Sequence, residues 1–283
     1  MKLYLFLLST VLINTISYSQ NSQVKKIDVA KLNDYLTKLP AAIKVTMSVE
    51  SISGNQYFMH RATEKVPSAS VIKVPILIEL MEKVKIKQID LNKVHVLQAS
   101  DKVGGSGVLA NEPVGKKLTI RELAQEMVRS SDNTATNILI KEVGMDAINQ
   151  NLVKLGLTKT RLNRIMMDTL AAQQGRENYV NVVEINDLLR NIYKHKVATP
   201  ALCNEMIEIL KNCDDKTTIP RNLPKALEIA HKTGGLPYVR GDAAIVYTTQ
   251  PFIISIFVEG FTDATKAEQI IGDLAEICWS SLK

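Results

Sequence analysis

The stretch Val66–Met81 reads VPSASVIKVPILIELM, and it decides the fold. From Val74 onward it is apolar on nearly every side, and Glu79 is the one charged residue up to Met81. A helix that lacks a polar face has to lie inside a domain rather than on its surface. The stretch therefore predicts a buried central helix around which the rest of the chain packs.

The start of this helix carries a hydroxyl and an amine. Ser70 and Lys73 are three residues apart, so their side chains project from the same helical face. In one interpretation Ser70 is an N-cap and Lys73 a surface lysine that extends its amine to water. In the other, Ser70 is a nucleophile whose proton passes to a lysine kept neutral by burial and by a second cation.

Length and composition indicate a folded globular protein. The chain has 283 residues, 46% hydrophobic and 23% charged, which suits one large domain or two lobes and excludes disordered and collagen-like classes. The formal net charge of +6 suits a small anionic substrate. Because no basic cluster is interleaved with aromatic residues, no nucleic-acid partner is expected.

The first 19 residues have the layout of a secretory signal peptide. A lysine precedes an apolar run, Leu3–Ile13, and a polar segment follows. The run is too short to span a membrane. We expect cleavage close to Ser19 or Gln20 and a periplasmic or secreted mature protein, residues 20–283. No cysteine ends the leader, so no membrane anchor is expected after cleavage.

Cysteine and histidine usage gives no sign of a metal. The cysteines are Cys203, Cys213 and Cys278, so at most one intramolecular disulfide can form. If Cys203 and Cys213 share one helix, they lie about 15 Å apart along it and cannot pair. The four histidines show no ligand spacing for zinc, and we predict neither a metal nor a cofactor.

Periodicity along the chain divides it into three parts. Alternating residues in Ile43–Ile52 predict a strand exposed on one face, and Gln56–His60 would complete a hairpin. A long helical middle follows, then strands and a closing helix. The expected helices are Thr119 onward with a Thr119/Glu122 capping box, Thr134–Val143, Asp146–Leu155, Val182–Tyr193, Pro200–Leu210 and Asp263–Leu282; the late strands are Ala226–Lys232, Ala243–Thr248 and Phe252–Glu259.

This order predicts an α/β fold with an antiparallel sheet flanked by helices. If the early hairpin pairs with the late strands, residues 20–62 and 220–283 form a sheet lobe. Residues 63–219 would then form an inserted all-helical lobe. A cleft is expected where the two lobes meet.

Three short motifs fall where such a cleft would need them. They are Ser70–Lys73 (SVIK), Ser131–Asn133 (SDN) and Lys232–Gly234 (KTG). The first opens the buried helix, the second lies at a break between two helices, and the third ends a predicted strand. Each motif alone occurs by chance in many proteins, so only their combination is informative.

This combination resembles the penicillin-recognising serine hydrolases and, in particular, the class A β-lactamases. The resemblance covers the mature chain and includes SDNTATN at residues 131–137 and HKTGG at residues 231–235. It implies the β-lactamase/transpeptidase fold, which agrees with the element order above. The implied substrate is a small molecule, either a β-lactam or an acyl-D-alanyl-D-alanine peptide, and we expect a monomer.

The resemblance also implies roles in acyl transfer. Ser70 corresponds to the nucleophile and Lys73 to its general base or proton relay. Ser131 would pass a proton to the leaving nitrogen. Asn133 would bind the amide of the substrate's side chain.

The third motif corresponds to the family's substrate-binding strand. Lys232 and Thr233 would hold the substrate carboxylate. The backbone N–H of Gly235, together with that of the nucleophile, would form the oxyanion hole. Arg240 could assist in binding the carboxylate, but we expect it to be a solvent-exposed strand arginine. Asp132 and Asn137 are expected to brace loops.

The loop Thr160–Tyr179, TRLNRIMMDTLAAQQGRENY, departs from the family pattern. Class A enzymes carry there a glutamate that activates water, and this chain has Met166. The nearest carboxylate is Asp168, which could serve only if the loop is rearranged, and is otherwise a capping residue. Asn178 stands where an aspartate usually pairs with the loop arginine, so the pairing of Arg164 is open.

Three functions remain in view at this point. The first is an exported class A β-lactamase-like serine hydrolase in which Asp168 or another arrangement supplies the water. The second is a D-alanyl-D-alanine peptidase acting on peptidoglycan, which the missing glutamate favours. The third is a β-lactam-binding sensor or sink that acylates slowly or stalls.

Overall fold

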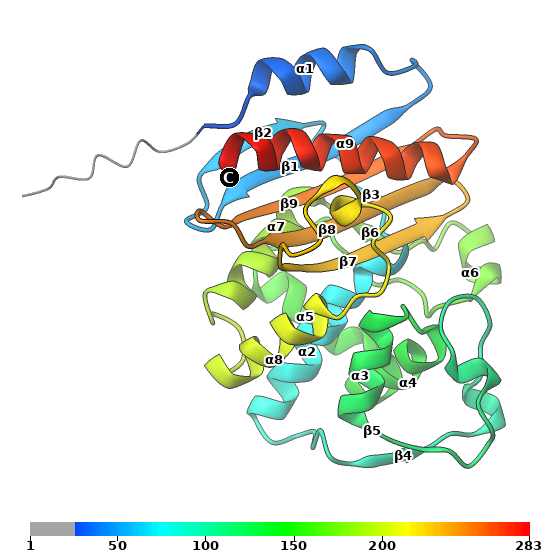
Figure 1. Cartoon of the computed structure of the whole chain (residues 1–283). Helices are drawn as coiled ribbons and strands as arrows, with labels where there is room; N and C mark the ends of the chain where they lie inside the picture. Colours follow the sequence, from blue (N-terminus) through cyan, green and yellow to red (C-terminus); the bar gives the residue numbers. More distant parts are fainter. Residues whose placement is uncertain (1–25) are drawn as a thin grey trace, which may run out of the picture.

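Five antiparallel strands form the main sheet in the computed structural model, which describes residues 26–283 (Figure 1). The predicted leader lies outside the described residues. The strand order is β2-β1-β9-β8-β7, so the early hairpin pairs with the late strands, as predicted. The strands are β1 Lys44–Ser51, β2 Gln56–His60, β7 Ile229–Leu236, β8 Val239–Val246 and β9 Phe252–Glu259.

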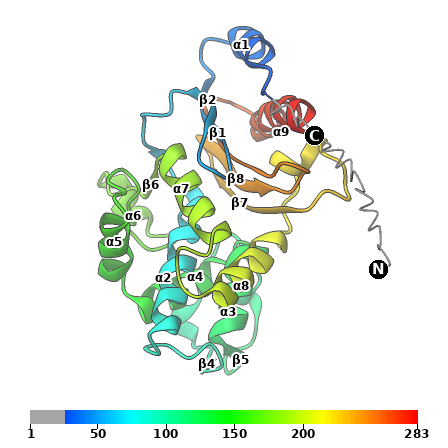
Figure 2. The ribbon, with the colours of Figure 1, turned by 90° about the vertical axis from the view of Figure 1, so that its left-hand side faces the viewer.

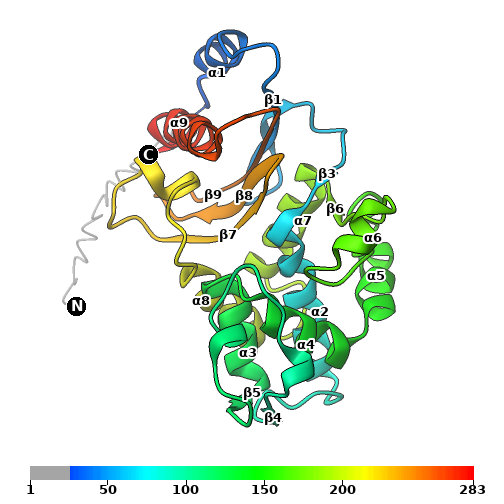
Figure 3. The ribbon, with the colours of Figure 1, turned by 90° about the vertical axis from the view of Figure 1, so that its right-hand side faces the viewer.

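Helices cover both faces of this sheet. Helices α1 (Val29–Thr37) and α9 (Ala264–Leu282) lie on one face, and α7 (Val182–Tyr193) lies on the other with the remaining helices (Figures 2 and 3). The two end helices are joined by a hydrogen bond from Tyr35 Oη to Asp273 Oδ2 of 2.7 Å. The fold is therefore an α/β architecture with the sheet between two helical layers.

The expectation that β1 is exposed on one face is wrong. Its polar residues Thr46, Ser48 and Glu50 are 0% exposed. Helix α7 covers them: Asn186 Nδ2 donates to the Ser48 carbonyl at 3.2 Å, and Arg190 forms an ion pair with Glu50. The polar side chains of β1 are thus buried against neighbouring elements rather than in contact with water: Glu50 pairs with Arg190 of α7, and Ser48 Oγ donates to Gln56 of β2.

The central helix is buried, as predicted. Helix α2 (Lys73–Lys85) is buried from its first residue to Met81 and runs through the helical lobe (Figure 1). Ser70 precedes it in a short 3₁₀ turn, η1 (Ala69–Ile72), and is not its N-cap. The helices of this lobe are α3 Ile120–Arg129, α4 Asn133–Val143, α5 Met145–Lys154, α6 Thr169–Gln173 and α8 Pro200–Lys211.

Short elements complete the described chain. The capping box is confirmed, because Thr119 Oγ1 accepts from the Glu122 N–H and Glu122 accepts from the Thr119 N–H. No helix within residues 26–283 combines the length and apolarity that crossing a membrane requires. The short elements are β3 Val66–Pro67, β4 Val94–Val96, β5 Lys117–Thr119, β6 Tyr179–Val180, η2 Ala99–Asp101, η3 Leu109–Asn111 and η4 Ile219–Asn222.

Two details differ from the sequence expectation. The Lys232–Gly234 motif lies inside β7 rather than at its end, because the strand continues to Leu236. Helix α8 ends at Lys211, so Cys203 and Cys213 do not share one helix. Both thiols are buried and free, as is Cys278.

Candidate active site

Lys73 lies at the centre of a polar cluster that joins the first two motifs. Its Nζ lies 3.0 Å from Ser70 Oγ and 3.0 Å from Ser131 Oγ. It also donates to the Ser131 carbonyl at 2.7 Å and to Asn133 Oδ1 at 3.1 Å. Lys73 is 0% exposed, so the interpretation of a snorkelling surface lysine is wrong.

The environment of Lys73 favours the neutral amine. Burial lowers the pKa of Lys73 well below its usual value, and the nearby cation of Lys232 lowers it further. A neutral amine has two N–H groups and one lone pair. The Ser131 carbonyl and the Asn133 amide oxygen can only accept, so they take up both N–H groups. The lone pair is then available to a hydroxyl of Ser70 or Ser131.

Three of the seven non-glycine residues with positive φ among residues 26–283 lie close to these groups. Ala69, Ser131 and Met167 have φ angles of 43°, 55° and 64°, in the left-handed region that non-glycine residues seldom occupy. One of them precedes Ser70, and the other two lie at the second motif and in the 160–179 loop. Such strain persists only where the surrounding structure imposes it, and it is concentrated at functional sites.

The second motif is held by its own middle residue. Asp132 is the N-cap of α4 and accepts from the Ala135 N–H at 2.8 Å. Its other oxygen accepts from the N–H groups of Val108 and Leu109 at 2.7 and 2.8 Å. A Cβ on Gly107 would lie 2.2 Å from this carboxylate. Asp132 therefore braces the neighbouring loop, as expected, and fixes the position of Ser131.

The third motif brings a second buried lysine to the cleft. Lys232 is 0% exposed, its Nζ donates to the Thr233 carbonyl at 2.8 Å, and burial lowers its pKa. Strand β7 passes close to the 3₁₀ turn of Ser70, because a Cβ on Gly234 would lie 3.0 Å from the Ser70 nitrogen. Glycine at this position allows the strand and the nucleophile to approach each other.

A hollow of about 410 Å³, here called the polar hollow, opens between these three motifs. Its walls are polar, and its charged lining consists of three cations, Arg129, Lys232 and Arg240, and two carboxylates, Asp214 and Asp215, that pair with the arginines. Lys232 is therefore the cation that suits an anionic group of a ligand. The residues that define it are Ser70, Ser131, Lys232, Thr233, Gly235 and Arg240.

Arg240 is not the solvent-exposed arginine that the sequence led us to expect. Its side chain is 13% exposed and forms ion pairs with Asp215 at 2.6 Å and Glu268 at 2.9 Å. Its Nε is buried with no hydrogen-bond partner among the described residues. Both carboxylates come from distant segments of the chain, so the local sequence around Arg240 gives no sign of this burial.

A buried ion pair between His231 and Asp242 joins β7, next to the third motif, to β8. His231 Nδ1 lies 3.0 Å from Asp242, and both side chains are 0% exposed. Although burial opposes the charged form, Asp242 raises the pKa of His231 to about 9. Within residues 26–283, no group of three or more His, Cys, Asp and Glu side chains is arranged to hold a metal ion.

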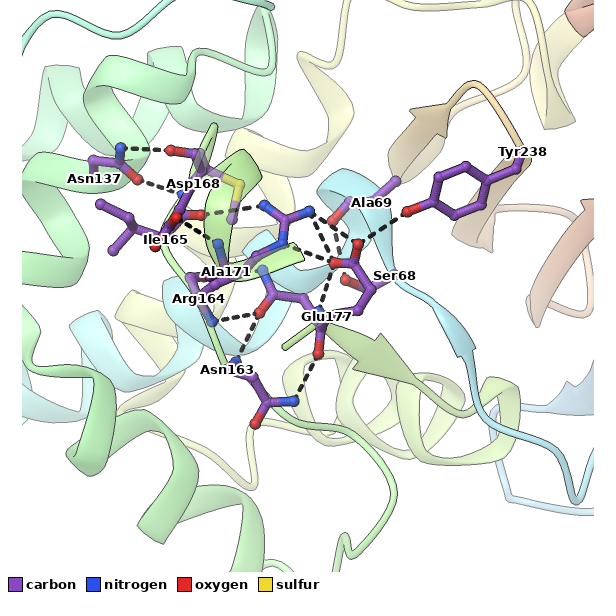
Figure 4. Close-up of polar contacts among 12 residues, drawn as sticks. Ser68, Ala69, Asn137, Asn163, Arg164, Ile165, Asp168, Ala171, Glu177 and Tyr238 are labelled. Carbon is purple, nitrogen blue, oxygen red and sulfur yellow. Dashed lines mark hydrogen bonds and ion pairs between the residues drawn. The ribbon is translucent and has the colours of Figure 1, made fainter. Parts of the chain in front are cut away.

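Arg164 of the 160–179 loop does form an ion pair. Its partner is Glu177 and not a residue at position 178, where the family usually has an aspartate. Glu177 pairs with Arg164 at 2.8 Å, and each side chain is 10% exposed (Figure 4). Asn178 Oδ1 instead accepts from the N–H groups of Asn163 and Arg164. Glu177, which was not among the predicted site residues, is the neighbour of Asn178 in the sequence, and this adjacency is the signal that could have identified it.

Met166 is fixed by its backbone. Asn137 Oδ1 accepts from the Met166 N–H at 2.8 Å, and Asn137 Nδ2 donates to the Met166 carbonyl at 3.0 Å (Figure 4). Asn137 thus braces the loop, as expected. Asp168 is the N-cap of the short helix α6, where its Oδ1 accepts from the Ala171 N–H at 2.9 Å. The carboxylate named as a candidate for water activation is therefore used as a helix cap.

A second hollow of about 520 Å³ opens from Ser70 on the side of this loop, and we call it the apolar hollow. Most of its lining is apolar. One wall is the 160–179 loop and the other is the end of β7 with the following turn, including Tyr238, which the sequence analysis did not single out. The residues that define it are Ser70, Asn133, Met166, Met167, Leu236 and Tyr238.

Known proteins similar to this chain include several β-lactamases. β-Lactamase ROB-1 of Haemophilus influenzae is 27% identical over 235 residues, which cover 79% of this chain and 75% of that protein. The crystal structure of a β-lactamase from Sphaerobacter thermophilus is 27% identical, with a TM-score of 0.83 over 90% of this chain and 98% of that one. The structure of PBP-A, 22% identical with a TM-score of 0.81 over 90% of this chain and 97% of that chain, shares the fold.

The family match covers almost the whole described chain. Residues 29–282 match the model of the β-lactamase enzyme family. The matched range includes Lys73, the two serines beside it (Ser70 and Ser131) and strand β7, which carries Lys232. The chain therefore belongs to the β-lactamase enzyme family and is a β-lactamase-like serine hydrolase.

Proposed function

We propose that this protein opens the β-lactam amide through an acyl-enzyme on Ser70, with Lys73 as the general base. The observation that carries the proposal is the fully buried Lys73 amine, 3.0 Å from Ser70 Oγ. A hydroxyl becomes an effective nucleophile when a base at hydrogen-bond distance takes its proton. The lowered pKa of Lys73 makes its amine such a base.

Ser131 would carry the proton to the leaving group. In the proposed step Ser70 Oγ attacks the carbonyl carbon, and its proton moves to Lys73 Nζ. Ser131 Oγ, 3.0 Å from the same nitrogen, gives its own proton to the amide nitrogen and is reprotonated by Lys73. The C–N bond breaks, the acyl group stays on Ser70, and no net proton is gained or lost.

The remaining site residues would bind the substrate. Lys232 and Thr233 supply charge and hydroxyl for the substrate carboxylate in the polar hollow. Asn133 would bind the amide of the acyl side chain. The backbone N–H groups of Ser70 and Gly235 would form the oxyanion hole, where each donor is worth about 3 kcal/mol in comparable enzymes.

The described residues provide no evident general base to activate water for deacylation. Met166 cannot activate water, and Asp168 is used as the cap of α6. We therefore propose that the acyl-enzyme accumulates and that hydrolysis of β-lactams is slow. The same observation favours a second candidate, a D-alanyl-D-alanine peptidase acting on peptidoglycan, whose serine is acylated by β-lactams but which turns over only with peptides.

Class, location and assembly also belong to this proposal. The three motifs support assignment to the class A enzymes. The order of lysine, apolar run and polar segment in residues 1–19 supports export to the periplasm or medium by a cleaved leader. We propose that the mature protein is a monomer.

One experiment separates these functions. Mature protein is mixed with a chromogenic cephalosporin, the colour change is followed over time, and the intact mass is measured at intervals. Slow continuous turnover with an adduct on Ser70 is the expected result. A single stoichiometric burst with a lasting adduct would indicate the peptidase, which is then assayed with an acyl-D-alanyl-D-alanine peptide. No colour change and no adduct would overturn the proposal.

A further inference from the structure

The free thiol of Cys213 borders the polar hollow. Cys213 is 2% exposed and lines this hollow together with Ser70 and Lys232. The other two cysteines have different surroundings: Cys203 Sγ donates to a backbone carbonyl, and Cys278 is buried among apolar side chains. These two thiols therefore serve as internal references for the reactivity of Cys213.

A histidine and a carboxylate stand behind this thiol. Cys213 forms a hydrogen bond with His231, and His231 Nδ1 lies 3.0 Å from Asp242 Oδ2. Asp242 Oδ2 also accepts from Thr218 Oγ1 at 2.7 Å and from the Ile219 N–H at 3.2 Å. The carboxylate is thus an acceptor, so Nδ1 carries a proton and Nε2 is the nitrogen left for the thiol. A thiol, a base beside it and a third group that orients the base form the pattern of an activated nucleophile.

Positive charge surrounds this cluster. Lys216 Nζ lies 3.4 Å from His231 Nε2, and Lys232 follows His231 in β7. Although burial raises the pKa of Cys213, the hydrogen bond and charge of His231 and the charge of Lys232 lower it to about 7. Burial instead raises the pKa of Cys203 and of Cys278. Near neutral pH a large share of Cys213 is therefore thiolate, whereas the two reference cysteines remain thiols.

The segment that carries Cys213 is held on both sides of the hollow. The Asp214 N–H donates to the Arg129 carbonyl at 3.0 Å, and Asp215 pairs with Arg240 at 2.6 Å. These contacts keep the thiol next to His231. The hollow of about 410 Å³ admits a molecule as small as hydrogen peroxide without any movement of the chain.

We propose that Cys213 is a peroxide-reactive thiolate and that its oxidation blocks the polar hollow to the substrate carboxylate. The sulfur attacks one oxygen of hydrogen peroxide, so that an S–O bond forms and the O–O bond breaks. Cys213 is oxidised by two electrons to a sulfenic acid, and the peroxide is reduced by the same two electrons. The leaving hydroxide takes the proton of His231 Nε2 and departs as water, and His231 regains a proton from the solvent.

The added oxygen would stand beside Lys232. Burial lowers the pKa of Lys232, and the charge of the Cys213 thiolate opposes this effect, so the sulfur lies close to the amine. A sulfenic oxygen would therefore enter the part of the polar hollow where Lys232 would hold the substrate carboxylate. This block rests on the proposed function, whereas the oxidation of Cys213 does not depend on it.

The first test measures oxidation in the absence of any β-lactam. The protein is treated with hydrogen peroxide, catalase stops the reaction, and unfolding in dimedone followed by iodoacetamide labels sulfenic acids and then thiols. Peptide masses give the oxidation rate of each cysteine. We expect Cys213 to be oxidised about 20-fold faster than Cys203 and Cys278. Three rates within about twofold of one another would overturn the proposal.

His231→Gln tests how the thiol is activated. Glutamine keeps a hydrogen-bond donor but carries no charge, so the oxidation of Cys213 should slow about tenfold while Cys203 and Cys278 stay slow. An unchanged Cys213 rate in a folded variant would remove His231 from this role. An unfolded variant is recognised by equal, fast oxidation of all three cysteines, and the comparison within the parent protein then decides.

The second test measures the labelling of Ser70 by benzylpenicillin before and after peroxide. Labelling of the parent should slow about tenfold once Cys213 is oxidised and recover when dithiothreitol reduces the sulfenic acid. Cys213→Ser is the matched control: peroxide still reaches its methionines, and its labelling rate should be the same before and after treatment.

The outcomes separate this inference from the proposed function. If Cys213 is oxidised and labelling of Ser70 continues at the same rate, the block of the hollow is overturned. If Cys213→Ser loses labelling as the parent does, the loss comes from another residue, and the block is again overturned. A parent that is not labelled before peroxide would overturn the proposed function, and the oxidation rates would still decide the reactivity of Cys213.

Discussion

Asn137 holds both backbone polar groups of Met166, accepting from its N–H at 2.8 Å and donating to its carbonyl at 3.0 Å. This two-sided contact fixes the backbone independently of the side chain at position 166. Met166 lines the apolar hollow next to Ser70 and is only 6% exposed. A side chain at position 166 therefore faces the hollow in which an acyl group on Ser70 would lie. Methionine at this position cannot activate water.

Replacement of Met166 by glutamate should consequently speed deacylation. We expect the rate of loss of the Ser70 adduct in Met166→Glu to rise about 100-fold, the range of a positioned general base. Burying the carboxylate should lower the free energy of unfolding by about 1–3 kcal/mol. Intact mass over time and urea unfolding measure the two effects. Met166→Gln has the same shape without the base, and equal acceleration in that variant would contradict the explanation.

The nucleophile is tested by Ser70→Ala. Covalent labelling by penicillin should disappear, because the hydroxyl that attacks the amide is absent, while the free energy of unfolding should change by no more than about 1 kcal/mol. Ser130→Ala is the control, since Ser130 also lines the polar hollow but its hydroxyl bonds to Glu126. Labelling that persisted in Ser70→Ala would remove Ser70 from its role.

The pH dependence of acylation should report the charge of Lys73. The base must be neutral, so acylation is fast above the pKa of Lys73 and is lost as the pH falls through it. Because the cation of Lys232 lowers this pKa, Lys232→Met should move the acid limb of the acylation profile to higher pH. Thr233→Ala alters the same polar hollow without a change of charge, and its acid limb should stay in place.

Asp168→Asn tests whether this carboxylate handles water. Asparagine caps helices as well as aspartate does, so the contact with the Ala171 N–H is expected to survive. We predict an unchanged deacylation rate, followed as the loss of adduct mass, and an unchanged midpoint of thermal unfolding. A selective slowing of deacylation, with acylation intact, would instead give Asp168 the catalytic role.

The Arg164–Glu177 pair should contribute strongly to stability. Glu177→Gln leaves a guanidinium that is 10% exposed without its charged partner, which should lower the free energy of unfolding by about 3 kcal/mol. Urea unfolding measures this difference. The matched control is Glu64→Gln, which breaks an exposed pair with Arg61 and should cost less than about 1 kcal/mol. Similar losses in both variants would show that burial of the loop pair is unimportant.

Local patterns were enough to predict most of the secondary structure. The strands Gln56–His60 and Phe252–Glu259 and the helix Val182–Tyr193 have the bounds that the sequence indicated. These elements have strong periodicity and clear turn signals at their ends. The face of β1 was misjudged, because the distant helix α7 decides whether the polar side chain of Glu50 meets water or Arg190.

The sequence by itself determined the chemical inventory: a serine and a lysine at the entry to a buried helix, the two further motifs, and methionine in place of the loop glutamate. A spacing of three residues is short-range geometry, so the contact between Lys73 and Ser70 followed from it, although Ser70 lies in the 3₁₀ turn before α2. Only the tertiary structure decided which carboxylates meet which cations. Glu177 binds Arg164 and Tyr238, Asp215 binds Arg240, and Asp168 caps α6, because charge pairing depends on distances between segments that no local pattern encodes.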